Sequence, residues 1–127
     1  MTVNEVLGLL DGDSPRRLLP FIPLLHGRRP FVAGAVPRLG VPGIRFSDGA
    51  RGVVIGASTA FPVTMARAAT WNPQLETRVG HVIGLETRAQ GANYSASVCV
   101  NLLRHFAWGR AQECYGEDPV LNEHCSI

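Results

Sequence analysis

The sequence predicts an α/β fold in which a strand, a helix and a second strand follow one another. A short strand-like run at residues 43–47 ends in the turn signal Asp48-Gly49. A helical pattern with recognisable ends follows at 72–91, and a nearly continuous apolar run follows that at 94–103. Because strands joined through a helical crossover lie parallel, this order is typical of a βαβ unit.

The first segment, residues 1–33, is expected to be an irregular wrap around the rest of the chain. A short helix is predicted at 3–10. The prolines that recur between Pro15 and Pro37 would interrupt a long helix or a central strand.

The helix at 72–91 is defined by local chemistry at both ends. Asn72 is a good N-cap, Pro73 fits the first helical position, and Gly91 can adopt a left-handed conformation after the last turn. One face is apolar, and the opposite face, which carries His81, is expected to face water. The apolar positions are Leu75, Val79, Val82, Ile83 and Ala89.

Shorter elements are predicted on either side. A helical stretch is expected from Pro62, as its first residue, to Ala69, before the long helix. The run at 94–103 is expected to be a strand buried on both faces. Near the end of the chain, Asp118 and Pro119 predict the start of another helix.

Composition describes one ordered globular domain. The chain has 127 residues, of which 46% are hydrophobic and 17% charged. All 12 basic residues are arginine, so lysine-dependent chemistry is excluded for this polypeptide. A net charge of +2 without a basic cluster argues against nucleic acid. No run approaches a membrane span, and no secretory signal is evident, which favours the cytoplasm.

Three cysteines, Cys99, Cys114 and Cys125, are odd in number and match no metal-binding spacing. Reduced thiols are the simplest interpretation, and neither a metal nor a cofactor is expected. Cys99 is expected to pack as a small hydrophobe, and Cys114 to be partly exposed.

Two charged residues stand where strand-like runs give way to loops. Asp48 follows the first run and Arg104 follows the second. Since ligands of α/β folds bind beyond the carboxyl ends of the strands, Asp48 and Arg104 are predicted to face the same ligand. One acceptor and one donor suit a polyhydroxylated substrate such as a sugar.

Five stretches resemble the N-terminal barrel of family 3 glycoside hydrolases, the β-glucosidase group. Together they cover roughly residues 34–121, in the order and spacing of that family. They are Val36-Pro37-Arg38-Leu39-Gly40-Val41-Pro42-Gly43, Phe46-Ser47-Asp48-Gly49-Ala50-Arg51-Gly52, Ser58-Thr59-Ala60-Phe61-Pro62, Ala68-Ala69-Thr70-Trp71-Asn72-Pro73, and Asn101 through Pro119. The resemblance implies that residues 34–127 are the incomplete N-terminal portion of a (β/α)8 barrel, limited to its first two to three βα units.

The resemblance also assigns roles to residues. It implies that Asp48 accepts hydrogen bonds from sugar hydroxyls and that Arg104 donates to them. His105 and Trp108 are further substrate-binding candidates, and Trp108 could instead be a packing anchor. Three residues, Arg110, Glu113 and Glu117, are expected to shape their loop by mutual charge pairing.

The family acts with retention, and its nucleophile and acid/base lie outside these residues, so no catalytic residue is expected in this chain. The parent activity implied is hydrolysis of terminal β-linked sugars, and the isolated chain is predicted to be inactive. Ala50 and Phe106 replace prolines usual in the family, and residues 124–127 depart from the expected helix, which suggests a chain cut short or frameshifted.

A non-catalytic sugar-binding or assembly subunit is the alternative. Such a subunit would complete its fold with a partner chain, or self-associate through exposed barrel edges. A nucleotide-binding βαβ unit is excluded, because neither a GxGxxG motif nor a P-loop lies between strand and helix.

Overall fold

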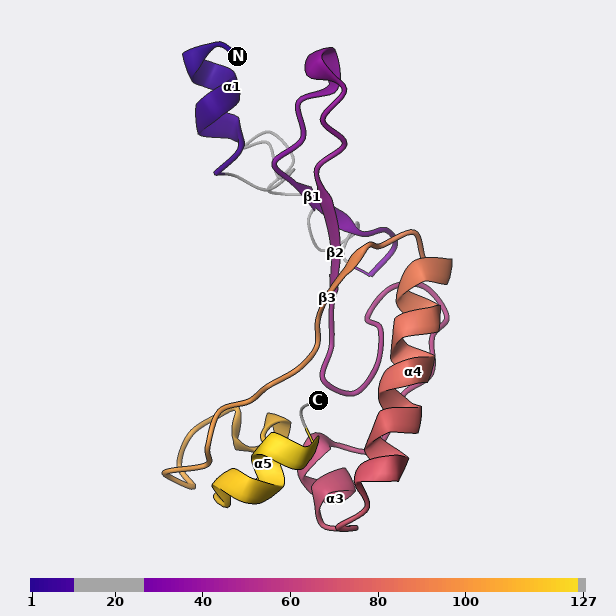
Figure 1. Ribbon diagram of the computed structural model, residues 1–127, viewed down its shortest axis with the longest axis vertical. Coiled ribbons are helices and arrows are strands. Elements are labelled where there is room, and N and C mark those ends of the chain that lie inside the picture. Colours follow the sequence, from indigo (N-terminus) through magenta and orange to yellow (C-terminus); the bar gives the residue numbers. More distant parts are fainter. Residues whose placement is uncertain (11–26, 126–127) are drawn as a thin grey trace.

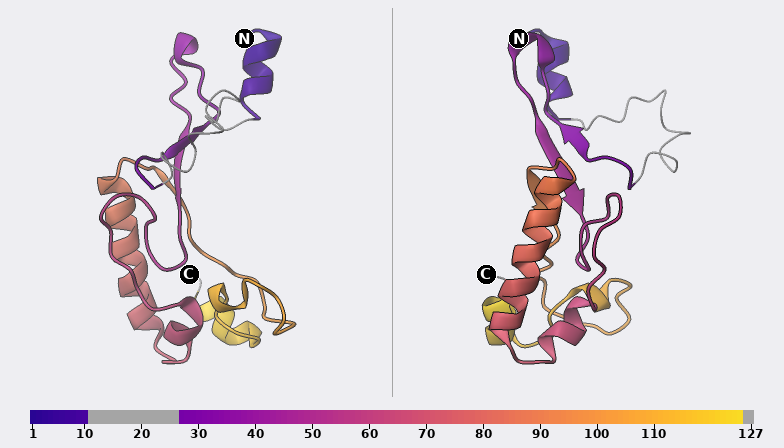
Figure 2. Two further views of the ribbon diagram at one scale, coloured as in Figure 1. Left: turned by 180° about the vertical axis from the view of Figure 1, so that it is seen from behind. Right: turned by 90° about the vertical axis from the view of Figure 1, so that its right-hand side faces the viewer.

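The computed structural model describes residues 1–10 and 27–125 of the chain. Its shape is elongated, with a small sheet in the middle and helices toward the ends (Figure 1). Helix α1 (Val3–Gly8) stands at one end. Helices α3 (Thr64–Ala68) and α5 (Pro119–Cys125) gather at the other end, as both views in Figure 2 show. The long helix α4 (Pro73–Ala89) runs along one side between them.

The sheet has three short strands in the order β1-β2-β3. Strand β2 (Ile44–Asp48) pairs in parallel with β3 (Tyr94–Ala96), and Asp48 lies opposite Ala96. This pair, joined through α4, confirms the predicted βαβ unit.

Strand β1 (Phe31–Ala33) pairs antiparallel with the other side of β2 and was not predicted. Its Phe31 ring lies 5.9 Å from that of Phe46, measured between centroids. Pro30 immediately precedes β1, a position that an edge strand tolerates because the missing N–H is not needed for pairing. The described part of the N-terminal segment therefore contains a strand that the sequence did not predict.

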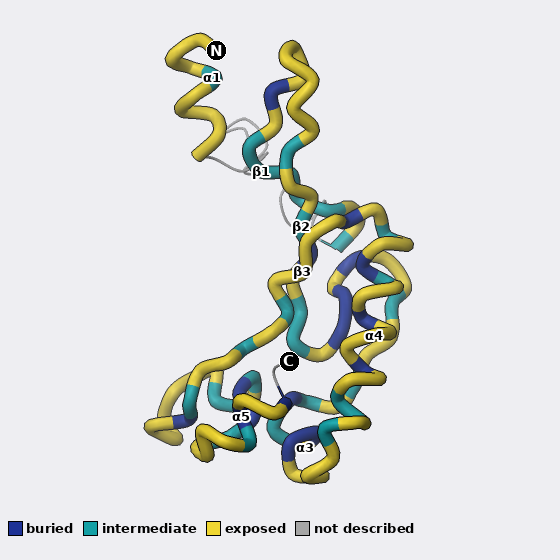
Figure 3. Tube along the Cα trace, viewed as in Figure 1, coloured by how far each residue is buried: buried dark blue, intermediate teal, exposed yellow. Residues whose placement is uncertain are grey.

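The expected ends of α4 are confirmed. Asn72 Oδ1 accepts a hydrogen bond from the Leu75 amide at 3.0 Å, and Gly91 adopts a φ of 83° just beyond the helix. Val79 and Ile83 are buried against Val53 and Ile55 of the preceding loop. That contact forms one small core, and in Figure 3 buried stretches of backbone lie along and beside α4.

A second core lies where α3, α5 and the loop before α5 meet. It consists of Ala68, Tyr115 and Cys125, with Leu121 packed against it. Asp118 Oδ1 accepts from the Leu121 amide at 2.8 Å, so the predicted cap of α5 is present. Helix α5 extends through Cys125, further than the sequence indicated.

Two predicted elements are wrong in extent. Helix α3 begins at Thr64 rather than Pro62, because Val63 keeps an extended ψ of 150°. Strand β3 ends at Ala96 and is exposed throughout. Val98 and Val100, predicted to be buried, are more than half exposed, because in the described part of the chain no further strand covers β3.

Helix α1 is close to the predicted helix at 3–10. Thr2 and Glu5 form a reciprocal capping box at its start. Glu5 also forms an ion pair with Arg38, at 2.8 Å between Oε1 and Nε. Because Arg38 belongs to the short helix η2 (Pro37–Leu39) between β1 and β2, this ion pair connects α1 to the β1–β2 connection. Among the described residues, no helix is both long and apolar enough to cross a membrane.

Candidate functional site

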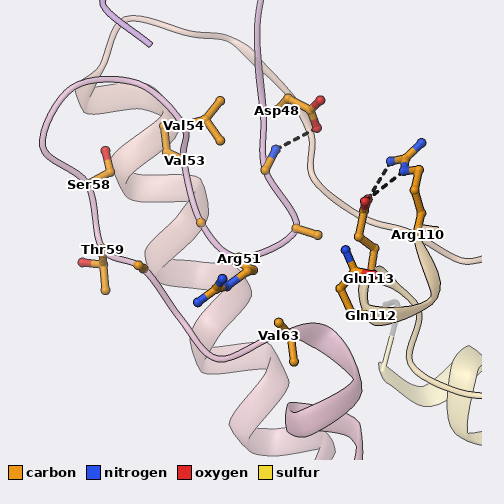
Figure 4. A pocket seen from close by; sticks show the side chains of 14 residues that line it. Asp48, Arg51, Val53, Val54, Ser58, Thr59, Val63, Arg110, Gln112 and Glu113 are labelled. Atoms are coloured by element: carbon orange, nitrogen blue, oxygen red, sulfur yellow. Dashed lines mark hydrogen bonds and ion pairs between the residues drawn. The ribbon is translucent and has the colours of Figure 1, made fainter.

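An open pocket of about 570 Å³ lies at the carboxyl end of β2 (Figure 4). One wall is the segment from Asp48 to Val63. The other includes the short helix η3 (Ala111–Glu113) and Arg110 before it. The lining residues are Asp48, Gly49, Ala50, Arg51, Gly52, Val53, Val54, Ser58, Thr59, Ala60, Val63, Arg110, Gln112 and Glu113.

Asp48 is the acidic residue of the first wall. It is exposed at the last position of β2, and its Oδ1 accepts a hydrogen bond from the Gly49 amide at 2.7 Å. An ionised carboxylate has about four acceptor sites, so this single bond leaves capacity for hydroxyl donors. Asp48 therefore lies at the end of a strand, as predicted, and it lines a pocket.

The loop after Asp48 depends on glycine. Gly49 and Gly52 have φ values of 121° and 124°, a region that L side chains rarely adopt. A Cβ on Gly52 would collide with the Thr59 carbonyl oxygen. The loop therefore folds back on itself at this point. A hydrogen bond from the Phe61 amide to the Arg51 carbonyl, at 2.7 Å, joins its two arms.

The second wall is held by an ion pair. Arg110 donates from Nε and Nη2 to the two carboxylate oxygens of Glu113, at 2.9 and 2.6 Å. The hydrogen bonds and charge of Arg110 lower the pKa of Glu113, and those of Glu113 raise the pKa of Arg110. The negative charge of Asp48, which lines the same pocket, adds a smaller contribution to the rise in the pKa of Arg110.

The structure therefore brings Asp48 together with Arg110 and Glu113. Arg104 is exposed on the loop leading to η3 and is not among the lining residues of this pocket. The common ligand of Asp48 and Arg104 stays a prediction. Arg51 and Gln112 also line the pocket, although neither was predicted to bind a ligand. The glycine-rich stretch around Arg51 is the sequence feature that could have indicated it.

The other predicted residues lie outside the pocket lining. His105 and Trp108 share one turn, in which the Trp108 amide donates to the His105 carbonyl at 3.1 Å. Trp108 is 37% exposed, so its indole is accessible in part. Glu117 is exposed between η3 and α5.

The cysteines differ from expectation. Cys114, the residue directly after η3, is fully buried rather than partly exposed. Cys99 is half-buried and its Sγ donates to Glu113 at 3.5 Å. Burial raises the pKa of both thiols, which disfavours the reactive thiolate. Within residues 1–10 and 27–125, no group of three or more potential metal ligands is found.

Comparison with known protein families decides the family. The glycosyl hydrolase family 3 N terminal domain matches residues 32–126. The chain belongs to glycosyl hydrolase family 3. It is 37% identical over 113 residues to a β-glucosidase of Rhizobium radiobacter and 38% identical over 114 residues to a probable β-glucosidase I of Emericella nidulans. These alignments cover 84% and 85% of this chain but only 14% of each relative.

A solved structure of a longer family 3 protein also matches this chain over only part of its own length. β-Glucosidase 3B from Thermotoga neapolitana, in complex with α-D-glucose, superposes with a TM-score of 0.83 at 30% identity. The match covers 99% of this chain and 19% of that one. The predicted fold class, the first units of a TIM-type barrel, is confirmed.

Proposed function

We propose that this chain forms part of the sugar-binding site of a β-glucosidase-type hydrolase, one that cleaves terminal β-linked sugars with retention. The observation that carries the proposal is Asp48, exposed at the carboxyl end of β2 and facing an open pocket. The family membership and the glucose complex of a relative support the same conclusion.

The chemistry of the pocket suits a sugar. The Asp48 carboxylate can accept from two neighbouring hydroxyls, and each such charge-assisted bond contributes about 1.5–3 kcal/mol. Arg104 is proposed to donate to the same sugar, as the family resemblance implies. Arg110 is committed to Glu113 and shapes the wall instead.

The carboxylates of this pocket do not form a catalytic pair. Retention needs a nucleophile and an acid/base about 5–5.5 Å apart across the scissile bond. Glu113 is bound on both oxygens by Arg110 and its pKa is lowered, so it is held ionised and is unsuited to donate a proton. We infer that the nucleophile and the acid/base belong to other parts of a longer enzyme.

Glucose binding by the 127-residue chain tests the sugar site. In titrations followed by amide chemical shifts, D48N should weaken glucose binding about tenfold or more, because the variant loses a charged acceptor. The matched control is D118N, since asparagine also caps a helix and Asp118 lies outside the pocket lining. Equal affinities for the two variants would contradict the proposal. We expect no hydrolysis of an aryl β-glucoside by the unaltered chain. If the unaltered chain did hydrolyse this substrate and D48N did not, the inference that the chain lacks its catalytic residues would be wrong.

The exposed Val98 and Val100 favour a second candidate, a non-catalytic sugar-binding or assembly subunit. Sequencing the DNA that follows the Ile127 codon distinguishes the hydrolase from the non-catalytic subunit. The remainder of a barrel encoded there in any frame supports the hydrolase, whereas a stop codon followed by unrelated sequence supports the subunit.

A further inference from the structure

A buried ion pair connects the two walls of the pocket. Arg67, only 7% exposed, donates from Nε and Nη2 to the two carboxylate oxygens of Glu76, at 2.8 and 2.9 Å. The Tyr115 hydroxyl donates to Oε1 of the same Glu76 at 2.8 Å. These three residues form the Arg67–Glu76–Tyr115 network, in which a fork-shaped donor and a third hydrogen bond fix one carboxylate.

One arm of the network reaches the first wall. Arg67 Nη1 donates to the Ala50 carbonyl at 3.1 Å and to the Pro62 carbonyl at 2.8 Å. Ala50 lies two residues after Asp48, and Pro62 lies at the far end of the same loop. A single guanidinium therefore closes the loop at 50–62, which supplies most of the pocket lining.

The other arm reaches the second wall. Tyr115 lies two residues after Glu113, and its ring is buried in the core with Ala68 and Cys125. Burial, then the hydrogen bond and charge of Glu76, raise the pKa of Tyr115, which further favours the protonated hydroxyl that donates to Glu76. Glu76, on α4, thus holds both walls with one carboxylate.

Removing one partner of this network is expected to be costly. Burial disfavours the charged form of Arg67, but the hydrogen bonds and charge of Glu76 outweigh it and raise the pKa of Arg67. A buried charge left without its partner destabilises its surroundings more than the pair itself stabilises them. The first groups to lose their position would be the carbonyls of Ala50 and Pro62.

We propose that the Arg67–Glu76–Tyr115 network sets the spacing of the two pocket walls and that Arg67 is a positioning residue for Asp48. None of the three side chains lines the pocket, so their effect on a ligand is indirect. The part of the inference that concerns ligand affinity rests on the proposed sugar-binding function. The part that concerns the walls does not.

Amide hydrogen exchange in the 127-residue chain tests each arm separately. R67K keeps the charge but loses the fork, and should speed exchange of the Phe61 amide about tenfold or more relative to Ile83 inside α4. Y115F should instead speed exchange of the Cys114 amide, which donates to the Ala111 carbonyl of the second wall. The controls are R88K and Y94F, which change exposed residues of the same types and should alter neither amide.

Glucose titration then separates this inference from the proposed function. R67K, at a temperature where circular dichroism shows it folded, should weaken glucose binding about fivefold. Local exchange changes without any glucose binding by the unaltered chain would contradict the sugar site and leave the network standing.

Two results would overturn the inference. One is that exchange of Ile83 rises as much as that of Phe61 and Cys114, which is general destabilisation. The other is that glucose binds the unaltered chain and R67K equally while the Phe61 amide is unchanged. If R67K does not fold, Y115F decides, and an unchanged Cys114 amide in that variant contradicts the proposal.

Discussion

At the scale of single residues, the pocket is organised by which charges are already paired. Glu113 is committed to Arg110 through two hydrogen bonds, whereas the carboxylate of Asp48 accepts from the Gly49 amide alone among the described contacts. A carboxylate with spare acceptor capacity can receive ligand hydroxyls, and one held by a guanidinium fork stabilises its loop. We therefore propose different roles for the two acids, although both line the pocket.

The pairing of Glu113 can be checked by titration. In R110Q the pKa of Glu113 should rise toward the ordinary value of about 4.3, because the hydrogen bonds and charge of Arg110, which contribute most of the lowering, are gone. A lowered pKa gives stability that is present above that ordinary value and is lost as pH falls through the folded-state value. The acid-induced loss of stability should therefore be smaller in R110Q. Carboxyl carbon shifts followed by NMR measure the pKa, with R78Q as control. An unchanged Glu113 titration would contradict the pairing.

Some residues in and around the pocket were singled out from the sequence and others were not, for a physical reason. Asp48 was identified because a strand and a turn signal adjoin it. Arg67 and Glu76 were missed as a pair because they belong to different helices and meet only through tertiary packing. Arg110 was assigned to its loop, and its place in the pocket wall follows from the path of that loop beside β2.

At the scale of elements, those with local end signals were predicted and those that depend on distant partners were not. Helix α4 follows its caps, Asn72 and Gly91, closely. Strand β1 depends on its pairing with β2, and a run of three residues is too short for the sequence to predict that pairing. Strand β3 ends early because the apolar residues after it have no neighbouring strand to pair with in the described part of the chain.

The loop after β2 should be sensitive to one added methyl group. G52A should lower the free energy of unfolding by about 1–3 kcal/mol, because its φ of 124° is unfavourable for alanine and the Cβ would collide with Thr59. The same variant should weaken glucose binding. G109A is the matched control, since a Cβ there meets no atom within 4 Å. Urea denaturation of both variants gives the comparison, and equal midpoints would show that the loop tolerates the change.

At the scale of the whole molecule, the described fold is elongated, and long stretches of its backbone are exposed (Figure 3). It has two small cores, and many of its large hydrophobic side chains are exposed. Tyr94, Val98 and Val100 are each more than half exposed along one extended segment. In a parallel barrel such a segment is covered by the next strand. The two β-glucosidase relatives are about seven times longer than their matched part, which leaves ample chain in those proteins to cover the corresponding segment.

Without that cover, the segment should drive self-association of the 127-residue chain. An uncovered strand edge with apolar side chains is a template for pairing with a second copy. Sedimentation velocity should show association that increases with protein concentration and that decreases in a variant carrying both V98K and V100K. V120K is the control, because Val120 is equally exposed on α5, away from the sheet. A chain that stays monomeric at every concentration, or that responds to V120K as strongly as to the double variant, would show that this edge is not the contact surface.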